Sequence, residues 1–346
     1  MSLTRRQFLA TTGAAALGAA PRNQVKIGVE MGCISSAKYT PFQYLDYLAG
    51  IGASVAQFSA STLGVNLASP DEEVIKKVRE YAAAKGITTP AFSSGCICPT
   101  STGFNSKAGT AEEQIAQGLK LSRMMGATAM RGVVGGAKER PQIEIHMQSM
   151  SRLLKGMRSQ IRESGVKIAL ENHGGDFQAR ELKALVEDVG FDILGICLDS
   201  GNPLWMLEDP HLTLELLGPY SIVSHVRDTA VWRVPEGVAV RWVNMGEGNV
   251  DIDGWINKFL AVQPAVPVTF ENIVSGQPRL IRVFDAATFK DYPKMPAGDL
   301  ARFLALAERG KPVPAQPAAP GKSRSQQQLD DLEFCVRYTR KLLSAA

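Results

Sequence analysis

Four largely apolar runs in the second half of the sequence each end on a side chain that can bind a metal ion. The runs Val166–Leu170, Ile193–Leu198, Ser221–Ser224 and Val266–Phe270 are followed by Glu171, Asp199, His225 and Glu271, respectively. Short apolar runs are typical of buried strands in a parallel sheet, and α/β folds place their chemistry at the carboxyl ends of these strands. We therefore expect three carboxylates and one imidazole to meet at one mouth.

The strands that carry these residues are preceded by further strand and helix segments in alternation. Four earlier strand candidates span Val25–Val29, Ser54–Phe58, Thr88–Phe92 and Ala127–Val134. The intervals from Glu171 to Asp199 and from Asp199 to His225 each match one strand and helix repeat. Eight such units predict an α/β fold, the (β/α)8 TIM barrel. A doubly wound sheet is the alternative, although nothing resembles its Gly-rich phosphate turn.

The chain divides into a short leader and one long domain. Residues 1–22 are predicted as an export signal, and residues 23–346 as the barrel. Ile143–Ser164 is expected to form one long helix. The interval between His225 and Glu271 leaves room for a long loop over the mouth. An insertion is expected at about 282–322, beside the mouth or against a second copy in a homo-oligomer, and a final helix at about 326–343.

The first residues are typical of a targeting segment. Thr4-Arg5-Arg6-Gln7-Phe8-Leu9 is followed by an uncharged Ala/Gly/Leu stretch through Ala20. This pattern resembles a twin-arginine export signal. It predicts recognition by the twin-arginine export machinery and a periplasmic protein, tethered to the membrane if the segment is not cleaved. The alternative is a chance arginine pair near a disordered start.

Composition excludes some classes of function. The 346 residues are 45% hydrophobic and 21% charged, which is ordinary for a globular protein that can bury a large core. The formal net charge is +4, and the basic residues are dispersed, so we expect no nucleic-acid partner. Five cysteines do not resemble a disulfide framework. We interpret Cys96 and Cys98 as packing residues, with a thiol pair or soft-metal site as the alternative.

Several motifs together resemble one family. They are Ala169-Leu170-Glu171-Asn172-His173, Leu198-Asp199, His225-Val226-Arg227-Asp228, Gly246-Glu247-Gly248-Asn249-Val250-Asp251 and Phe270-Glu271. These segments resemble the xylose isomerase-like TIM barrels, the sugar isomerase and epimerase family. The resemblance covers roughly residues 24 to 344. It implies a metal-dependent enzyme that acts on a small carbohydrate.

The four strand-end side chains also predict a metal site on physical grounds. Glu171, Asp199 and Glu271 would repel one another strongly in a mouth of low dielectric constant, and a divalent cation removes that repulsion. Hard oxygen ligands with the imidazole of His225 suit Mn²⁺, while Mg²⁺, Co²⁺, Fe²⁺ and Zn²⁺ are alternatives. Taken singly, each residue has a simpler interpretation as a strand-end acid in a cap or an ion pair.

The resemblance assigns a mechanism to two of the four ligands. In the epimerases that this sequence resembles, two metal-bound glutamates flank the substrate. One withdraws the proton next to the carbonyl group, and the other returns it to the opposite face of an enediolate. Here these residues are Glu171 and Glu271. Asp199 and His225 mainly hold the metal.

Five further residues are candidates for substrate binding. His173 and Arg227 stand two residues beyond Glu171 and His225, on the same side of an extended chain. A supporting role behind the ligands is the alternative for His173, and an ion pair with Asp228 or another acid for Arg227. The other candidates are Asn202, Glu247 in a turn, and Trp205. Trp205, like Trp232 and Trp242, could supply an apolar face for a sugar ring. The alternative for all three is that they pack in the protein interior.

Two features indicate the substrate class: a residue that differs from the family pattern, and the predicted export signal. Several ketose epimerases have a histidine where this chain has Asn202, and an exported enzyme meets few sugar phosphates. We therefore expect a keto-sugar, a keto-glycoside or a cyclitol, isomerised or epimerised by proton transfer. A lyase, dehydratase or glycoside-cleaving enzyme with the same enolate chemistry is one alternative. A non-catalytic exported sugar-binding protein is another.

Overall fold

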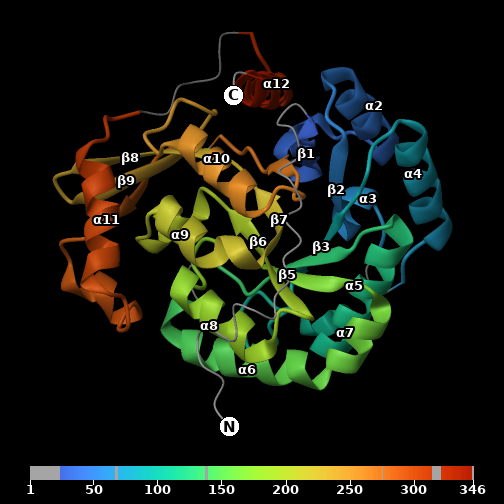
Figure 1. Cartoon of the computed structure of the whole chain (residues 1–346), viewed down its shortest axis with the longest axis horizontal. Coiled ribbons are helices and arrows are strands. Elements are labelled where there is room, and N and C mark those ends of the chain that lie inside the picture. Colours follow the sequence, from blue (N-terminus) through green and yellow to red (C-terminus); the bar gives the residue numbers. More distant parts are fainter. Residues whose placement is uncertain (1–23, 67–68, 137–138, 275, 314–320, 345–346) are drawn as a thin grey trace.

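The fold is the expected TIM barrel. The computed structural model describes residues 24–66, 69–136, 139–274, 276–313 and 321–344. Eight parallel strands form a nearly closed barrel with helices around it, in the order β10-β1-β2-β3-β4-β5-β6-β7 (Figure 1). These strands are β1 Ile27–Glu30, β2 Val55–Ser59, β3 Ala91–Cys96, β4 Ala129–Val133, β5 Lys167–Glu171, β6 Leu194–Asp199, β7 Ser221–His225 and β10 Val268–Phe270.

The barrel closes between its last two strands. Val226 forms a parallel bridge with Phe270, and its N–H donates to the Thr269 carbonyl oxygen over 2.8 Å. The Ser224 hydroxyl accepts from the Thr269 N–H and donates to the Pro267 carbonyl oxygen. These contacts bring the end of β7 next to the end of β10, which places His225 beside Glu271.

Helices surround the barrel in the βα order that the sequence predicted. They are α2 Pro41–Ile51, α3 Ala60–Leu63, α4 Glu72–Ala84, α5 Ala111–Met125, α6 Ile143–Gly156, α7 Arg158–Ser164, α8 Ala179–Val189, α9 Pro210–Leu217 and α10 Ile252–Val262. The single helix expected over 143–164 is wrong, because Met157 leaves helical geometry at φ −92° and ψ 5° and separates α6 from α7. Helix α5 matches its expected bounds, since Thr110 caps its start and Gly126, at φ 78°, ends it.

Side-chain alternation divides the barrel interior into layers. Strand register sets Glu171 opposite Cys197, and Asp199 opposite His225. Below this level, small side chains form an apolar cluster that fills the narrow interior; its members are Ala91, Ala129, Ala169, Cys197 and Val223. Because successive residues of a strand point to opposite faces, the polar residues two positions further on gather above this layer.

The segment expected as a long loop over the mouth is a β-hairpin. Strands β8 Asp228–Val234 and β9 Gly237–Val243 pair in antiparallel fashion, and β11 Arg279–Ile281 adds to β9. Helix α11 Ala297–Glu308 covers this small sheet, and Figure 1 shows both together at one side of the barrel. Alternating valines of the hairpin bury against Phe303 of α11, which explains the strand geometry. The accessory unit thus begins before the expected boundary at 282.

The C-terminal helix α12 spans Arg324–Ser344, where the sequence predicted a helix at about 326–343. It buries Leu332 and Cys335 against the barrel and packs on the 3₁₀ segment η2, Met31–Ala37. Residues 1–23 lie outside the described residues, so the export signal stays a prediction. Within the described ranges, no helix has both the length and the apolar character needed to cross a bilayer.

One buried carboxyl group makes the stability of this fold depend on pH. Glu208 is 2% exposed, and its Oε1 accepts from the N–H of Ala179, the first residue of α8, over 2.9 Å. Burial raises the pKa of Glu208 to about 8. Its unfolded pKa is about 4.3. The stability contributed by the protonated form is therefore complete below about pH 4 and is lost as the pH rises through 8.

We predict that Glu208→Gln removes this dependence, because glutamine keeps an acceptor for Ala179 but cannot ionise. Relative to this variant, the wild type should lose about 1–3 kcal/mol of unfolding free energy between pH 5 and pH 9. Urea denaturation at both values measures the difference. Glu236→Gln, an exposed change in the β8–β9 turn, serves as the control. A difference between wild type and Glu208→Gln that is the same at both pH values would contradict the prediction.

Candidate metal centre

The four predicted metal ligands meet at the mouth of the barrel. Glu171, Asp199 and His225 are the last residues of β5, β6 and β7, and Glu271 directly follows β10. Each offers one ligand atom, and these atoms lie within 4.8 Å of one another. The first three side chains are completely buried, whereas that of Glu271 is 14% exposed. Glu271 is therefore the ligand that a molecule entering the mouth meets most directly.

The imidazole of His225 is oriented for metal binding through Nδ1. Its Nε2 lies 3.2 Å from Gln57 Oε1, and Gln57 in turn donates to the Ser93 hydroxyl. A proton on Nε2 for Gln57 leaves the lone pair on Nδ1. This atom is buried without a hydrogen-bond partner, 3.5 Å from Glu171 Oε1 and 3.6 Å from Glu271 Oε2. Three carboxylates around an unpartnered buried nitrogen fit a divalent cation.

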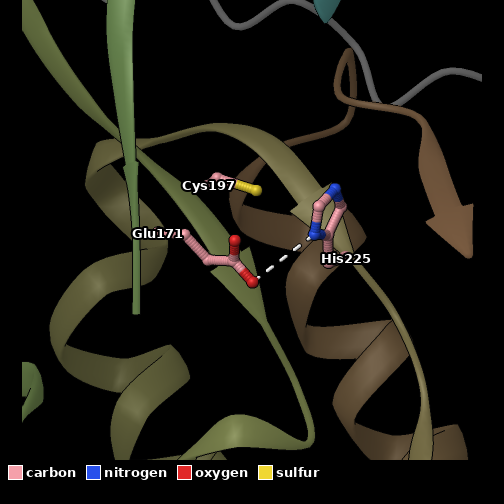
Figure 2. Close-up of side chains that lie close together, drawn as sticks. All are labelled: Glu171, Cys197 and His225. Carbon is pink, nitrogen blue, oxygen red and sulfur yellow. Dashed lines mark ion pairs between the residues drawn. The ribbon is translucent and has the colours of Figure 1, made fainter. Parts of the chain in front are cut away.

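A thiol lies beside this arrangement. Figure 2 shows the carboxylate of Glu171 directed toward the His225 ring, with the sulfur of Cys197 next to both. These three residues form a second possible ligand group, which would suit a softer metal such as zinc. Burial raises the pKa of the Cys197 thiol, so it stays protonated and is a weak ligand at neutral pH. The four-residue group with Asp199 and Glu271 is the better-matched site.

Arg131 in the middle of β4 is a central residue that the sequence analysis missed. Its Nε donates to Glu171 Oε2 over 2.5 Å, and its Nη2 pairs with the same oxygen and lies 3.8 Å from Glu271 Oε1. Arg131 therefore spans the two glutamates. The available signal was a lone charge inside the apolar run Ala127–Val134, because a buried strand rarely tolerates one without a partner.

Arg227 pairs with two metal ligands. Its Nη2 lies 2.5 Å from Asp199 Oδ2 and also pairs with Glu271, while the guanidinium stacks on Trp242, 4.2 Å from the ring centroid. The acid expected as its alternative partner, Asp228, instead accepts N–H bonds from the 246–248 turn. Arg227 Nη1 is buried without a hydrogen-bond partner. One donor of this otherwise engaged side chain thus remains for a bound molecule.

Asn202 supports the ligands directly. Its Nδ2 donates to Glu171 Oε1 over 3.1 Å, and its backbone N–H donates to Asp199 Oδ1 over 2.7 Å. It begins η5, the 3₁₀ turn Asn202–Met206 that follows β6. Asn202 was predicted as a substrate contact. The structure shows it bonded to two of the candidate ligands, where it helps to fix the direction of their carboxylates, and a contact with substrate stays a prediction.

The remaining candidates have contacts of other kinds. His173 is half-buried beyond β5, and its Nδ1 bonds to the Gly135 carbonyl oxygen. The ring of Trp205 stacks on that of Trp242 at 4.0 Å between centroids and 10° between planes. Trp232 packs in a separate cluster on the hairpin. Glu247 is exposed in the turn after β9 and contacts none of the four ligands among the described residues.

Charge compensation keeps the site ionised despite its burial. Burial alone raises the pKa of Glu171, but the guanidinium of Arg131 and the neighbouring imidazole of His225 outweigh it and hold this pKa well below its usual range. Glu30, at the end of β1, is different. Burial raises its pKa, and its Oε2 accepts the Gly32 N–H over 2.6 Å. Glu171 is thus a ready anionic ligand, whereas burial disfavours the charged form of Glu30.

The overall charge of the centre would be positive with a metal bound. Three carboxylate ligands and two guanidinium groups, with a divalent cation, leave a net charge of about +1. In a buried mouth this charge favours a negatively charged bound molecule.

Comparison with known proteins places this architecture in a family. The sequence profile of the "Xylose isomerase-like TIM barrel" family matches residues 45–281, which is more than half of the chain. The chain belongs to this family. The match includes Glu171, Asp199, His225 and Glu271. The fold is therefore that of a xylose isomerase-like barrel.

Individual relatives of this xylose isomerase-like barrel include enzymes of different reaction types. A 3-oxo-isoapionate decarboxylase of Pectobacterium atrosepticum is 25% identical over 147 residues, which are 42% of this chain and 52% of that protein. The chain thus spans about half the length of this curated relative. The fold resembles D-psicose 3-epimerase crystallised with D-fructose, with a TM-score of 0.61, 13% identity, and coverage of 92% and 99% of the two chains.

A metal-bound structure is also among the similar folds. A xylose isomerase-like barrel protein from Mycobacterium smegmatis in complex with magnesium gives a TM-score of 0.54 at 14% identity, covering 83% of this chain and 99% of that one. At this identity the likeness concerns the fold alone. The similar folds thus include an epimerase and a magnesium-bound protein.

We predict that the purified protein binds about one divalent ion per chain and that His225→Ala lowers the metal content at least tenfold. Removal of the imidazole leaves three crowded carboxylates with one fewer ligand for the cation. Elemental analysis measures the content, and Mn²⁺ added to chelated wild type should raise the melting temperature by about 5 °C or more. Glu112→Gln, on the exposed first turn of α5, is the control. Equal metal content in His225→Ala and wild type would refute the site.

Proposed function

We propose that this protein is a divalent-metal-dependent isomerase or epimerase that transfers a proton at the carbon next to a carbonyl group of a carbohydrate. The observation that supports this most directly is the placement of the Glu171 and Glu271 carboxylates, 3.5 and 3.6 Å from the same His225 nitrogen. They come from β5 and from the end of β10, so they approach one position from different strands. Two carboxylates on either side of one carbon can withdraw and return a proton.

The two glutamates differ in their surroundings, which suggests distinct roles. Glu171 is completely buried and is held by Arg131 and Asn202, so it is fixed and anionic. Glu271 is partly exposed and pairs with Arg227. In our proposal Glu171 accepts the proton from the substrate carbon, because its charge is secured, and Glu271 delivers a proton from the other side. The carbon is inverted when the two act on opposite faces.

A metal held by Glu171, Asp199, His225 and Glu271 would acidify the carbon-bound proton by polarising the adjacent oxygen atoms. We propose Mn²⁺ because the ligands are mainly hard oxygens, with the other divalent ions named above as alternatives. Around it, the guanidinium groups of Arg131 and Arg227 favour negative charge on the substrate.

Decarboxylation is the second candidate reaction, and the two arginines favour it. A 3-oxo acid loses CO₂ when the bond from its carboxylate carbon to the neighbouring carbon breaks, and the electron pair moves to the carbonyl oxygen as an enolate. A glutamic acid then protonates that carbon. Arg131 and Arg227 supply the positive surroundings that an acidic substrate needs. The partial match to a decarboxylase of an oxo acid is consistent with this chemistry.

The proposed substrate is a keto-sugar, keto-glycoside or cyclitol met outside the cytoplasm. This location rests on the predicted twin-arginine signal, with the export machinery as the partner. Elimination of a water or aglycone from the same enolate remains an alternative outcome. A sugar-binding protein without catalysis is a weaker proposal, because binding alone has no need for two carboxylates beside a metal position.

Isotope exchange tests the proposal. Metal-loaded enzyme incubated with a panel of keto-sugars and keto-glycosides in deuterated water should incorporate deuterium at the carbon next to the carbonyl group. Glu271→Gln should slow the exchange by about 100-fold or more while it retains metal, because glutamine can still coordinate through oxygen but cannot carry the proton. Mass spectrometry and elemental analysis give both values. Exchange at the wild-type rate in Glu271→Gln would refute the assigned role, and no exchange with any panel member would refute the proton transfer.

The role of Arg131 leads to a prediction about pH. Arg131→Gln removes the guanidinium that lowers the pKa of Glu171, so this pKa rises. A general base is active when deprotonated, so the acidic limb of the rate profile should move to higher pH, and the ratio of the rate at pH 5 to the rate at pH 8 should fall. Exchange rates measured from pH 5 to 9 on whichever panel member is active test this shift. Release of CO₂ from a 3-oxo acid, recorded in parallel, would identify decarboxylation as the reaction. An unchanged acidic limb would exclude Arg131 from this role.

A further inference from the structure

A second cleft lies beside the metal centre, between the accessory sheet and the barrel. Its volume is about 320 Å³, and the residues that matter for its chemistry are Arg140, Trp205, Arg279, Arg282, Asp291 and Tyr292. Arg279 and Arg282 come from β11 and its end, and Trp205 comes from η5, which also carries Asn202. We call this space the arginine cleft. Its size suits one sugar residue rather than a macromolecule.

The charges around the arginine cleft are not balanced internally. Arg140 is engaged, since it pairs with Glu181 and donates to the Asp291 carbonyl oxygen. Arg279 and Arg282 have no carboxylate within 4.0 Å anywhere in the described ranges. The only acid that lines the cleft, among these residues, is Asp291. Two cations therefore face the cleft without an acidic partner, which favours an anion there.

Arg279 is held in a way that leaves its donors available. Its guanidinium lies over the ring of Trp205, 5.0 Å from the centroid. A guanidinium stacked on an aromatic face keeps its N–H groups in its own plane, where a carboxylate can accept two of them side by side. Trp205 is itself fixed, because its other contacts include Trp242 and the backbone at Gly174, where a Cβ atom would lie 2.7 Å from its Cε3. The guanidinium of Arg279 is thus held in position before a ligand binds.

A continuous stack of rings and guanidinium groups joins the arginine cleft to the metal centre. Arg279 lies on Trp205, Trp205 stacks on Trp242 at 4.0 Å, and Trp242 carries Arg227 at 4.2 Å. Arg227 pairs with the metal ligand Asp199. The arginine cleft and the metal centre therefore lie on opposite ends of one row of packed side chains, with Trp205 and Trp242 between Arg279 and Arg227.

We propose that the arginine cleft is a binding subsite for a carboxylate-bearing sugar residue, such as a uronate, held mainly by Arg279. The inference rests on the proposed carbohydrate function and deepens it by naming an acidic substrate class. Arg282, which is exposed at the rim, contributes a second positive charge. A neutral sugar would leave both guanidinium groups without a counter-charge, whereas the carboxylate of an acidic sugar would pair with them.

Calorimetric titration of the purified full chain with glucuronate and with glucose tests the subsite. Wild type should bind glucuronate about tenfold or more tightly than glucose, because the carboxylate adds charge-assisted hydrogen bonds. Arg279→Gln should remove most of this preference, and Arg282→Gln a smaller part. Arg162→Gln, an exposed arginine on α7, should leave it unchanged. Equal binding of the two sugars, or a wild-type preference in Arg279→Gln, would overturn the proposal. Glucose 6-phosphate bound more tightly than glucuronate would overturn the carboxylate assignment.

Titration with and without metal separates this inference from the proposed function. The glucuronate preference should persist after chelation and in His225→Ala, because the arginine cleft contains none of the metal ligands. Loss of binding on chelation would show that the acid binds the metal, and the subsite would be refuted. Conversely, a preserved preference in a protein that exchanges no deuterium would leave the subsite standing and refute the catalytic proposal.

Discussion

The repulsion among buried carboxylates at the barrel mouth is the constraint on which the rest of the site depends. Glu171, Asp199 and Glu271 have their oxygen atoms close together, in a region that water barely reaches. At such distances and low dielectric constant, uncompensated charges would drive the ligands apart or force them to protonate. Arg131 and Arg227 oppose this by pairing with all three acids. The remaining negative charge is what a divalent cation would neutralise.

The accessory unit takes part in this compensation. Arg227 is kept in place by Trp242 of the hairpin, and Trp242 is supported by Trp205. The β8–β9 hairpin, although it lies outside the barrel, thus supports a residue that contacts the candidate ligands. The accessory unit also creates the arginine cleft, since β11 supplies Arg279 to the outer face of the same stack. The metal centre and the accessory sheet are thus coupled, because the sheet holds the positively charged side chains of Arg227 and Arg279 in place.

The barrel and its candidate ligands could be predicted from the sequence because both produce local sequence patterns. A short apolar run that ends in a carboxylate or imidazole identifies a strand and the polar residue at its end. Such reasoning missed Arg131, whose importance lies in side chains on β5 and at the end of β10 rather than in its own strand. It also joined α6 and α7, since apolar periodicity continues across Met157. The hairpin was missed because its valines bury against residues distant in sequence, among them Leu204 after β6 and Phe303 of α11.

The sequence by itself therefore determined the α/β barrel and the order along it of the four candidate ligands. The tertiary structure decided which charged groups pair with these side chains, since Arg131 and Arg227 reach them only when the strands close into a barrel. It also decided that His225 presents Nδ1, because Gln57 engages the other nitrogen. Periodicity records how each strand is buried, but an ion pair between strands depends on register and closure, which no local pattern contains.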